Sequence, residues 1–454
     1  MPREGARVVT NCTPQIDLFS IGRRKVTITG TGKFLTSNAG VLLAAKVERR
    51  LGLCSRLAGV LRDRRDPSYV KHSHEDQMRQ RVLQIACGYE DCNDANELRE
   101  EPAFLTAMGH LAGGADKLAS QPTLSRFEQR SAGELLRMSE ILADVWIDQL
   151  LARGPKAWRQ IVLDFDSTDD PTHGAQQLSM FHGYYDQHMY HPLVVFDGEG
   201  FPVAMVLRPG KAGASSGTVS ILLRIFRRIV DRLPRSAQIT FRADAGFALP
   251  EIYEMCRTLG IRYITGQNTF SFFKERVEDL VVEARKQYEE TGQKARLFTE
   301  FAYQAKTWKE PQRVIGKVEI SREGENIRFI TTNREEQDPE ANYDFYAGRG
   351  QAENFIKELK NAVFADRLSC SSFLANQFRL LLHTLAYIVL YELRRTAGLN
   401  ELARVQMDTL RLKLLKVGAC IVVTARRIWV HLSQHDPARP RFQLVAATLA
   451  AAGP

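Results

Sequence analysis

The segment NYDFYAGRGQAENFIKELK, at residues 342–360, carries a polar and an apolar pattern that both have helical spacing. At about 100° per residue, four polar side chains fall within an arc of roughly 60°: Tyr346, Arg349, Glu353 and Lys360. An adjoining apolar arc contains Ala352, Phe355, Ile356, Leu359 and Val363. Glu353 is therefore expected at the edge of a buried face, between two cations. That position fits a carboxylate that holds a metal ion beside a polyanion. It equally fits an amphipathic surface helix with charge pairs worth about 0.2–0.5 kcal/mol each.

The spacing Tyr346-x2-Arg349-x3-Glu353-x6-Lys360 resembles the Y-R-E-K signature of one large group of bacterial insertion-sequence DDE transposases. Other stretches resemble one family within that group, and the resemblance runs from about residue 35 to the predicted C-terminal hairpin at 418–432. These stretches are GYEDCNDANELREEPAF at 88–104, LASQPTLSRFE at 118–128, DDPTHGAQQLSMFHGYYDQHMYHPLVVFD at 169–197 and MVLRPGKAGASSGT at 205–218. One departure is Ala245, where the family has serine. The resemblance implies a ribonuclease-H-like core, three catalytic carboxylates and DNA as substrate.

Acidic residues follow two apolar, strand-like runs upstream of this segment. RQIVLDFDST at 159–168 resembles the first catalytic motif of the family with Asp166 as ligand, and RADAGF at 242–247 resembles the second with Asp244. Together with Glu353 they would bind two Mg²⁺ ions, or Mn²⁺ in their place, because hard divalent ions prefer carboxylate oxygens. A carboxylate at the end of an apolar strand is costly to bury unless it is paired or metal-bound. Each Asp alone also fits a turn or helix cap. Rivals for the first ligand position are Asp164, Asp169 and Asp170.

Several basic or aromatic residues are candidate DNA contacts. By the resemblance, Tyr346, Arg349 and Lys360 contact DNA near the scissile phosphate, and the alternative for each is a surface ion pair. The loop RPGKAGASSG offers Arg208 and Lys211 as phosphate ligands, or is a solvated loop. Arg242 is a further candidate that clamps DNA, and its alternative role is to neutralise the acidic site. Trp308 is a candidate for stacking on an extruded base, and its alternative is packing in a core.

The composition favours a polyanionic partner and a reducing compartment. Lys and Arg exceed Asp and Glu by 62 − 53 = +9. The seven cysteines are scattered without a CxxC pair, which argues against a disulfide framework and a structural zinc site. The four histidines of residues 173–191 also lack zinc-ligand spacing. The longest apolar run, at 380–391, is too short to span a bilayer, so no membrane association is expected. With the resemblance, this predicts a bacterial cytoplasmic protein at the nucleoid.

The chain divides by its pattern into four parts. Residues 1–150 are mostly helical with basic patches, and are expected to bind DNA ends unless these patches are merely solvated faces. Residues 151–270 and 336–400 show three strands followed by alternating helix and strand, which by periodicity supports only a mixed α/β sheet. Residues 271–335 predict a helix and three strands, a β-rich insertion domain. Residues 401–454 predict a hairpin, 418–424 with 428–432, then a frayed tail at 444–454, with a role in dimerisation or DNA contact.

The main hypothesis is a cut-and-paste transposase that cleaves DNA at terminal inverted repeats and joins the 3′-OH ends to target DNA. Because both ends must be cut together, a homodimer on paired ends is expected. Two alternatives stay open. One is a catalytically silent, transposase-derived DNA-binding protein, and the other is a ribonuclease-H-like nuclease without strand transfer.

Overall fold

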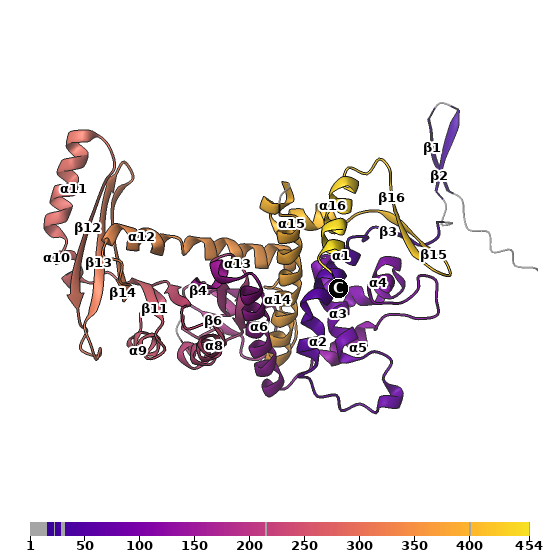
Figure 1. Ribbon diagram of the computed structural model, residues 1–454, viewed down its shortest axis with the longest axis horizontal. Helices are drawn as coiled ribbons and strands as arrows, with labels where there is room; N and C mark the ends of the chain where they lie inside the picture. The colour runs from indigo at the N-terminus through magenta and orange to yellow at the C-terminus, as the bar shows by residue number, and fades with distance from the viewer. Residues whose placement is uncertain (1–15, 22, 29–31, 214–215, 399–400, 454) are drawn as a thin grey trace, which may run out of the picture.

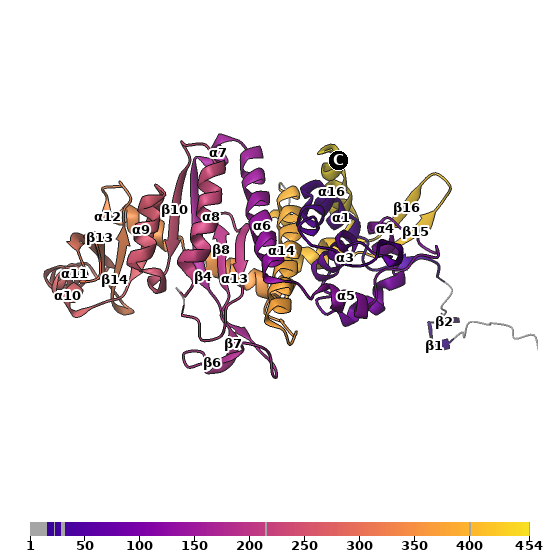
Figure 2. The same ribbon diagram turned by 90° about the horizontal axis from the view of Figure 1, so that it is seen from below.

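The computed structural model describes residues 16–21, 23–28, 32–213, 216–398 and 401–453. A large sheet lies at one end of an elongated molecule, and the N-terminal helices lie at the other (Figure 1). The long helix α14, Phe373–Thr396, stands between these two parts in both views (Figures 1 and 2). One continuous core of buried apolar side chains extends through both parts, so the helical region is not packed independently of the sheet.

Five strands form one side of the eight-stranded sheet, in the order β9-β8-β4-β10-β11 with β9 at the edge. Their bounds are β4 Gln160–Ser167, β8 Leu193–Asp197, β9 Pro202–Val206, β10 Gln238–Ala243 and β11 Arg262–Gln267. The first three strands are antiparallel, whereas β10 runs parallel to both β4 and β11. The three strands and the later alternation of helix and strand agree with the sequence-based prediction.

The insertion at residues 271–335 extends this sheet and does not form a sheet of its own. Strands β12 (Ala295–Tyr303), β13 (Gln312–Ser321) and β14 (Gly324–Thr332) are joined to it because β14 pairs antiparallel with β11. This pairing covers an edge of β11 that would otherwise present open backbone groups. The single helix predicted at 273–290 is in fact two, α10 (Ser271–Glu275) and α11 (Glu278–Thr291), and they pack on the sheet through a second apolar core.

Helices cover both faces of the sheet. Helices α8 (Thr218–Arg232) and α9 (Pro250–Thr258) lie on one face, and α12 (Pro339–Ala347) and α13 (Gly350–Val363) lie on the other (Figures 1 and 2). The expected single helix over 342–360 is thus interrupted at Gly348 and Arg349. Both residues keep right-handed helical angles, with φ near −57° and −56°, so α12 and α13 follow one another in nearly the same direction. The apolar arc predicted for α13 is buried, apart from half-buried Phe355.

The N-terminal part is helical, as predicted. Its helices are α1 Val41–Leu51, α2 Leu53–Ala58, α3 His74–Ala86, α4 Pro102–Ala107, α5 Gln121–Phe127, α6 Ala132–Ala152 and α7 Pro155–Trp158. Helix α6 is anchored to the sheet by the indole N–H of Trp146, which donates to the buried carboxylate of Asp197 at 2.8 Å. Before these helices, β1 (Ile16–Ile21) and β2 (Arg24–Ile28) form a separate hairpin.

Three arginines of α8 take part in the packing between α6 and α8. Arg228 and Arg232 bind Asp144 of α6, and Arg224 lies 3.3 Å from Glu140. These ion pairs connect the helical region to the sheet-covering helix, so the three arginines are held by the protein itself.

Helix α14 is long and apolar enough to cross a membrane by length and composition, but 89% of its most apolar window is buried inside the protein. It is longer than the apolar run seen in the sequence, and it packs against α3, α13 and β9. This burial identifies it as a core helix of the protein. The six cysteines among the described residues are all free thiols.

The C-terminal part contains the predicted hairpin. Strands β15 (Ala419–Val423) and β16 (Ile428–Leu432) pair antiparallel, and β15 also pairs with β3 (Leu35–Thr36). The prediction of a frayed tail was wrong. Residues Arg439–Ala451 form helix α16, because Phe442, Val445 and Leu449 recur on one side and are buried.

Candidate active site

Asp166 and Asp244 lie side by side at one edge of the sheet. β4 and β10 are parallel neighbours, and Phe165 of β4 is in register with Ala243 of β10. The next residue on each strand is an aspartate, so both carboxylates emerge where the strands end. Such an edge is the usual ligand-binding position in open α/β sheets.

Each aspartate also accepts a local backbone hydrogen bond. The Ser167 N–H donates to Asp166 at 2.8 Å. Asp244 caps the short helical turn Ala245–Phe247, whose Gly246 N–H donates to it at 2.9 Å. These bonds fix the orientation of both carboxylates.

Glu353 comes to the same place from the first turn of α13, and Arg349 connects it to the strands. Arg349 Nη1 lies 3.0 Å from Asp166 Oδ2, and Arg349 Nη2 lies 3.0 Å from Glu353 Oε1. The Arg349 side chain is mostly buried, whereas that of Glu353 is 63% exposed. The structure therefore joins Asp166 and Glu353 through one guanidinium group, with Asp244 at the end of the neighbouring strand.

Asp166 is a buried carboxylate beside two other acids. Its pKa is raised to about 6, mainly by burial and to a smaller extent by the carboxylates of Asp244 and Glu353, whereas Arg349 and the Ser167 N–H act in the opposite direction. At neutral pH a buried carboxylate is thus kept ionised at a cost in stability. Such a cost is typical of functional sites.

This cost predicts a stability gain for Asp166→Asn. Because the folded state holds the Asp166 proton more tightly than the unfolded state, wild-type stability falls as pH rises from about 4 to about 6. A pKa raised from 3.8 to about 6 corresponds to at most about 3 kcal/mol. We expect Asp166→Asn to be about 1–3 kcal/mol more stable than wild type at pH 7.5 in chemical denaturation, with the difference vanishing near pH 4. A gain that is independent of pH would contradict this explanation.

Tyr346 and Lys360 also lie at this edge. Burial raises the pKa of Tyr346, and Arg349 and Asp244 are close enough to influence it. A Cβ atom on Gly266 of β11 would lie 2.6 Å from the Tyr346 hydroxyl oxygen, so glycine is needed there for the tyrosine to approach. Lys360 Nζ lies 2.8 Å from Asp169 Oδ1 and also donates to the Asp169 carbonyl oxygen.

The three rivals for the first ligand position have other roles. Asp169 is paired with Lys360. Asp170 is 1% exposed and accepts no hydrogen bond from a described residue, and burial raises its pKa well above the usual range. Asp164 is 1% exposed and accepts from Arg242 Nε at 2.5 Å and Nη2 at 2.8 Å. Asp164 and Asp170 are therefore not accessible to a shared ion.

The prediction that Arg242 contacts DNA is corrected by this pair. Arg242 is 7% exposed, its third donor group reaches the carbonyl oxygen of Phe345 at 2.6 Å, and its guanidinium lies over the Phe345 ring. It lies opposite Asp164 in the register of β4 and β10, which spacing along the chain does not reveal. Arg242 therefore connects β10, β4 and α12 and is not accessible to DNA.

Two other predicted DNA contacts are also buried. Arg208 is 4% exposed and donates to the carbonyl oxygens of His191, Gly213 and Ser216, so it organises the loop that was expected to present it to phosphate. Trp308 is 8% exposed and packs edge-on against Tyr253 and Tyr303, which removes it as a stacking partner for an extruded base. Lys211 is exposed, and its DNA contact stays a prediction.

Sequence reasoning missed Tyr185. Its pKa is raised by burial and by the carboxylates of Asp169, Asp166 and Asp244, so the phenol lies near all three acids. Its ring is within 5.1 Å of His182 and 6.0 Å of His191, measured between centroids. The signal was the aromatic stretch HGYYDQH at 182–188, beside the small sheet of β5 (Asp170–Pro171), β6 (Met180–His182) and β7 (Gln187–Tyr190).

The carboxylate groups of the site are suitable ligands for a divalent cation, although they do not lie close enough together to coordinate one ion. Within the described ranges, no three Asp, Glu, His or Cys side chains are grouped closely enough to hold an ion. Arg349 lies between Asp166 and Glu353 and binds both. Carboxylate oxygens are nevertheless the ligands that Mg²⁺ prefers, and all three acids offer them.

Comparison with known protein families identifies the class of the chain. The family described as transposase DDE domain group 1 matches residues 19–454. The chain belongs to this DDE transposase family, whose members generally use divalent metal ions.

Comparison with individual proteins adds little. No curated protein matches the chain. Among solved structures, the chain is similar to a piggyBac transposase, which was determined by cryo-EM as a synaptic complex with hairpin DNA. The two sequences are 9% identical, the similarity covers 83% of this chain and 80% of that chain, and the TM-score is 0.39. A likeness this distant carries no argument here.

Proposed function

We propose that this chain is a cut-and-paste insertion-sequence transposase in which Asp166, Asp244 and Glu353 are the catalytic carboxylates. The observation that carries the proposal is the pairing of Asp166 and Glu353 with one guanidinium group, while Asp244 ends the parallel strand next to that of Asp166. Membership in the DDE family supports it.

The strand order supports a ribonuclease-H-like core made by residues 151–270 and 336–400. Three antiparallel strands followed by two parallel ones, in the order β9-β8-β4-β10-β11, fit that fold. Residues 271–335 would then be an insertion, residues 1–150 the DNA end-binding region, and residues 401–454 a region for dimerisation or DNA contact.

The three carboxylates would hold two Mg²⁺ or Mn²⁺ ions, which when bound supply Lewis-acid activation of phosphate and of the attacking oxygen. Arg349, Tyr346 and Lys360 would contact the DNA around the scissile phosphate. Arg349 suits this role because its guanidinium group, which now bridges two carboxylates with one nitrogen each, can instead donate two parallel hydrogen bonds to one phosphate.

The reaction proposed for this site has two stages. Water cleaves the DNA at the element ends, and the freed 3′-OH then attacks a phosphate of the target DNA, so each stage is an in-line displacement. A homodimer on paired terminal inverted repeats, acting at the nucleoid of a bacterial cytoplasm, would carry out both stages.

The proposal predicts metal-dependent cleavage and joining by the purified protein. A supercoiled plasmid that carries both ends of the element should be cut precisely at those ends in Mg²⁺ or Mn²⁺, and EDTA should abolish the cutting. Joined products with short target duplications are also expected, and sequencing of the recovered junctions measures them. Binding without cleavage would identify a silent DNA-binding relative, and cleavage without joined products would identify a nuclease.

A further inference from the structure

The hairpin of β1 and β2, which we call the N-terminal hairpin, has one polar and one apolar face. Residues paired across its two strands lie on the same side of the sheet. Asp17 accepts hydrogen bonds from Lys25 and Thr27, so these three side chains share the polar face. The pairing of the strands places a set of apolar side chains on the other face: Ile16, Phe19, Ile21, Val26 and Ile28. This division is typical of a sheet that packs on another surface through one face.

Most of the apolar face is uncovered in the part of the chain that the structure describes. Its four largest side chains are between 51% and 67% exposed: Ile16, Phe19, Ile21 and Ile28. A two-stranded hairpin is at best marginally stable in water unless it packs on something else. Exposed apolar patches with a polar rim mark interaction surfaces. The apolar face therefore requires a partner surface.

A second apolar sheet face lies uncovered at the same end of the molecule. The sheet of β3, β15 and β16 packs inward through Ala419 and Ile421. Its strand pairing places five residues on the outward face, which we call the C-terminal sheet face: Leu35, Cys420, Val422, Trp429 and His431. Leu35 is 63%, Trp429 44% and Val422 39% exposed. Figures 1 and 2 both show this sheet and the N-terminal hairpin at the end opposite the insertion.

The two faces match in kind and in size. Apolar sheet faces pack on one another in β-sandwiches. At about 200 Å² for a large apolar side chain, the exposed fractions amount to roughly 450 Å² on the hairpin and roughly 300 Å² on the sheet face. One contact of about 750 Å² is smaller than a specific stable interface, which buries at least about 1,200 Å². Two such contacts related by a two-fold axis bury about 1,500 Å², which is a standard interface.

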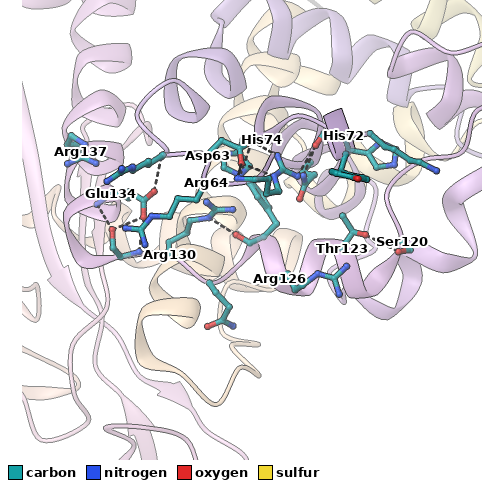
Figure 3. Close-up of a pocket in the computed structure, with 18 of the residues that line it drawn as sticks. Asp63, Arg64, His72, His74, Ser120, Thr123, Arg126, Arg130, Glu134 and Arg137 are labelled. Carbon is teal, nitrogen blue, oxygen red and sulfur yellow. Dashed lines mark hydrogen bonds and ion pairs between the residues drawn. The ribbon is translucent and has the colours of Figure 1, made fainter. Parts of the chain in front are cut away.

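Two hollows in the described part of the chain suit the hairpin less well. One, of about 900 Å³, lies among the N-terminal helices, and charged and polar side chains dominate its lining. Figure 3 shows four of its arginines: Arg64, Arg126, Arg130 and Arg137. The other, of about 360 Å³, lies beside Leu136 and Phe373 and is apolar but concave. Neither offers the flat apolar surface on which a sheet face packs.

We propose that the N-terminal hairpin of one copy packs on the C-terminal sheet face of a second copy, and that the hairpin of the second copy packs on the first in the same way. This exchange rests on the proposed function for the expectation that two copies act on paired ends, and it adds the surfaces that join them. Both hairpin turns are basic, with Arg24 beside one and Arg426 and Arg427 in the other, so packing that keeps the turns apart is expected. No residue of the candidate active site belongs to either face.

The test changes one face at a time in the full-length chain. The hairpin variant carries Phe19→Asp and Ile21→Asp, and the sheet variant carries Val422→Lys and Trp429→Lys. Wild type is expected to be a dimer at micromolar concentration without DNA or metal. Each variant should be a monomer, with a dissociation constant raised about 100-fold or more, because every contact would bury unpaired charges. Light scattering after size exclusion measures the mass, and circular dichroism should show wild-type folding because the changed side chains are exposed.

Mixing the two variants tests whether the hairpin crosses between copies. In the mixed dimer, one contact joins two acidic side chains to two basic ones, and the other contact is wild type. The mixture should therefore have the mass of two chains, although each variant alone is a monomer. A matched control carries Tyr69→Asp and Val282→Asp, at positions that are 84% and 63% exposed and belong to neither face. The control should remain a dimer.

Several results would overturn the exchange. A wild-type protein with the mass of one chain would show that the hairpin does not join two copies. A sheet variant that stays dimeric would indicate contact between two hairpins, and a hairpin variant that stays dimeric would indicate contact between two sheet faces. Two monomeric variants that do not restore the dimer when mixed would show that the two faces do not meet.

Failure of the exchange and failure of the proposed function give different results. The mass is measured without DNA or metal, so it does not depend on cleavage. If the exchange is wrong, the masses depart from the expected pattern while wild type still cleaves plasmid ends in Mg²⁺. If the proposed function is wrong, the masses follow the pattern and wild type does not cleave.

Discussion

Asp244→Asn is expected to slow DNA cleavage at the element ends by about 10³-fold or more, with little change in DNA affinity. Loss of one carboxylate weakens the binding of divalent ions, and stabilisation of transition-state charge by such ions is worth several kcal/mol. A loss of about 4 kcal/mol corresponds to about 10³-fold in rate. Asparagine also caps helices well, so the bond from the Gly246 N–H is retained and the local fold should not change. Gel analysis of plasmid cleavage and anisotropy with an end duplex measure the two effects.

The control for this substitution is Asp231→Asn, an equivalent change at an exposed position of α8 outside any ion pair with described residues. It should cleave at the wild-type rate. If Asp244→Asn cleaved at the wild-type rate as well, Asp244 would not belong to the catalytic set. If it lost DNA binding and cleavage together, its role would be in DNA binding or folding and not in chemistry.

The positions of strands and acids could be predicted because they depend on local pattern. The apolar runs that become β4 and β10 are each followed by a small or turn-forming stretch, so the ends of both strands, and with them Asp166 and Asp244, were evident from the sequence. The helical arc that carries Arg349 and Glu353 depends on local spacing in the same way. That Arg349 binds Asp166 as well as Glu353 depends on how α13 crosses β4, which local spacing does not specify.

Some features that the sequence did not reveal depend on partners far apart in the chain. β14 joins the sheet through its register with β11, more than 60 residues away, and no local pattern encodes that choice. Arg208 is a different case, because its partners are carbonyl oxygens only 5, 8 and 17 residues away that the folded loop brings to its side chain. The sequence around a charged residue in a loop or at a strand end has the same pattern whether its side chain faces DNA or a buried carboxylate.

Arg242→Met is expected to destabilise the protein by about 3–5 kcal/mol, the largest stability effect among the substitutions considered. The change leaves Asp164 buried without its bidentate partner, and an unpaired buried charge is far more costly than an exposed one. The midpoint of chemical denaturation at pH 7.5 measures the loss. If Arg242 contacted DNA instead, its substitution would lower the affinity of the protein for DNA and leave the free energy of unfolding unchanged.

The double variant Asp164→Leu with Arg242→Met separates the ion pair from the packing around it. Because it removes both charges and leaves apolar groups of similar size between β4, β10 and α12, most of the lost stability should return. Cleavage should return with it, since both residues act by holding Asp166 and Asp244 in register and not by touching DNA. If the double variant were stable but could not cleave, Arg242 or Asp164 would have a direct part in the reaction, and the structural role assigned to this pair would be wrong.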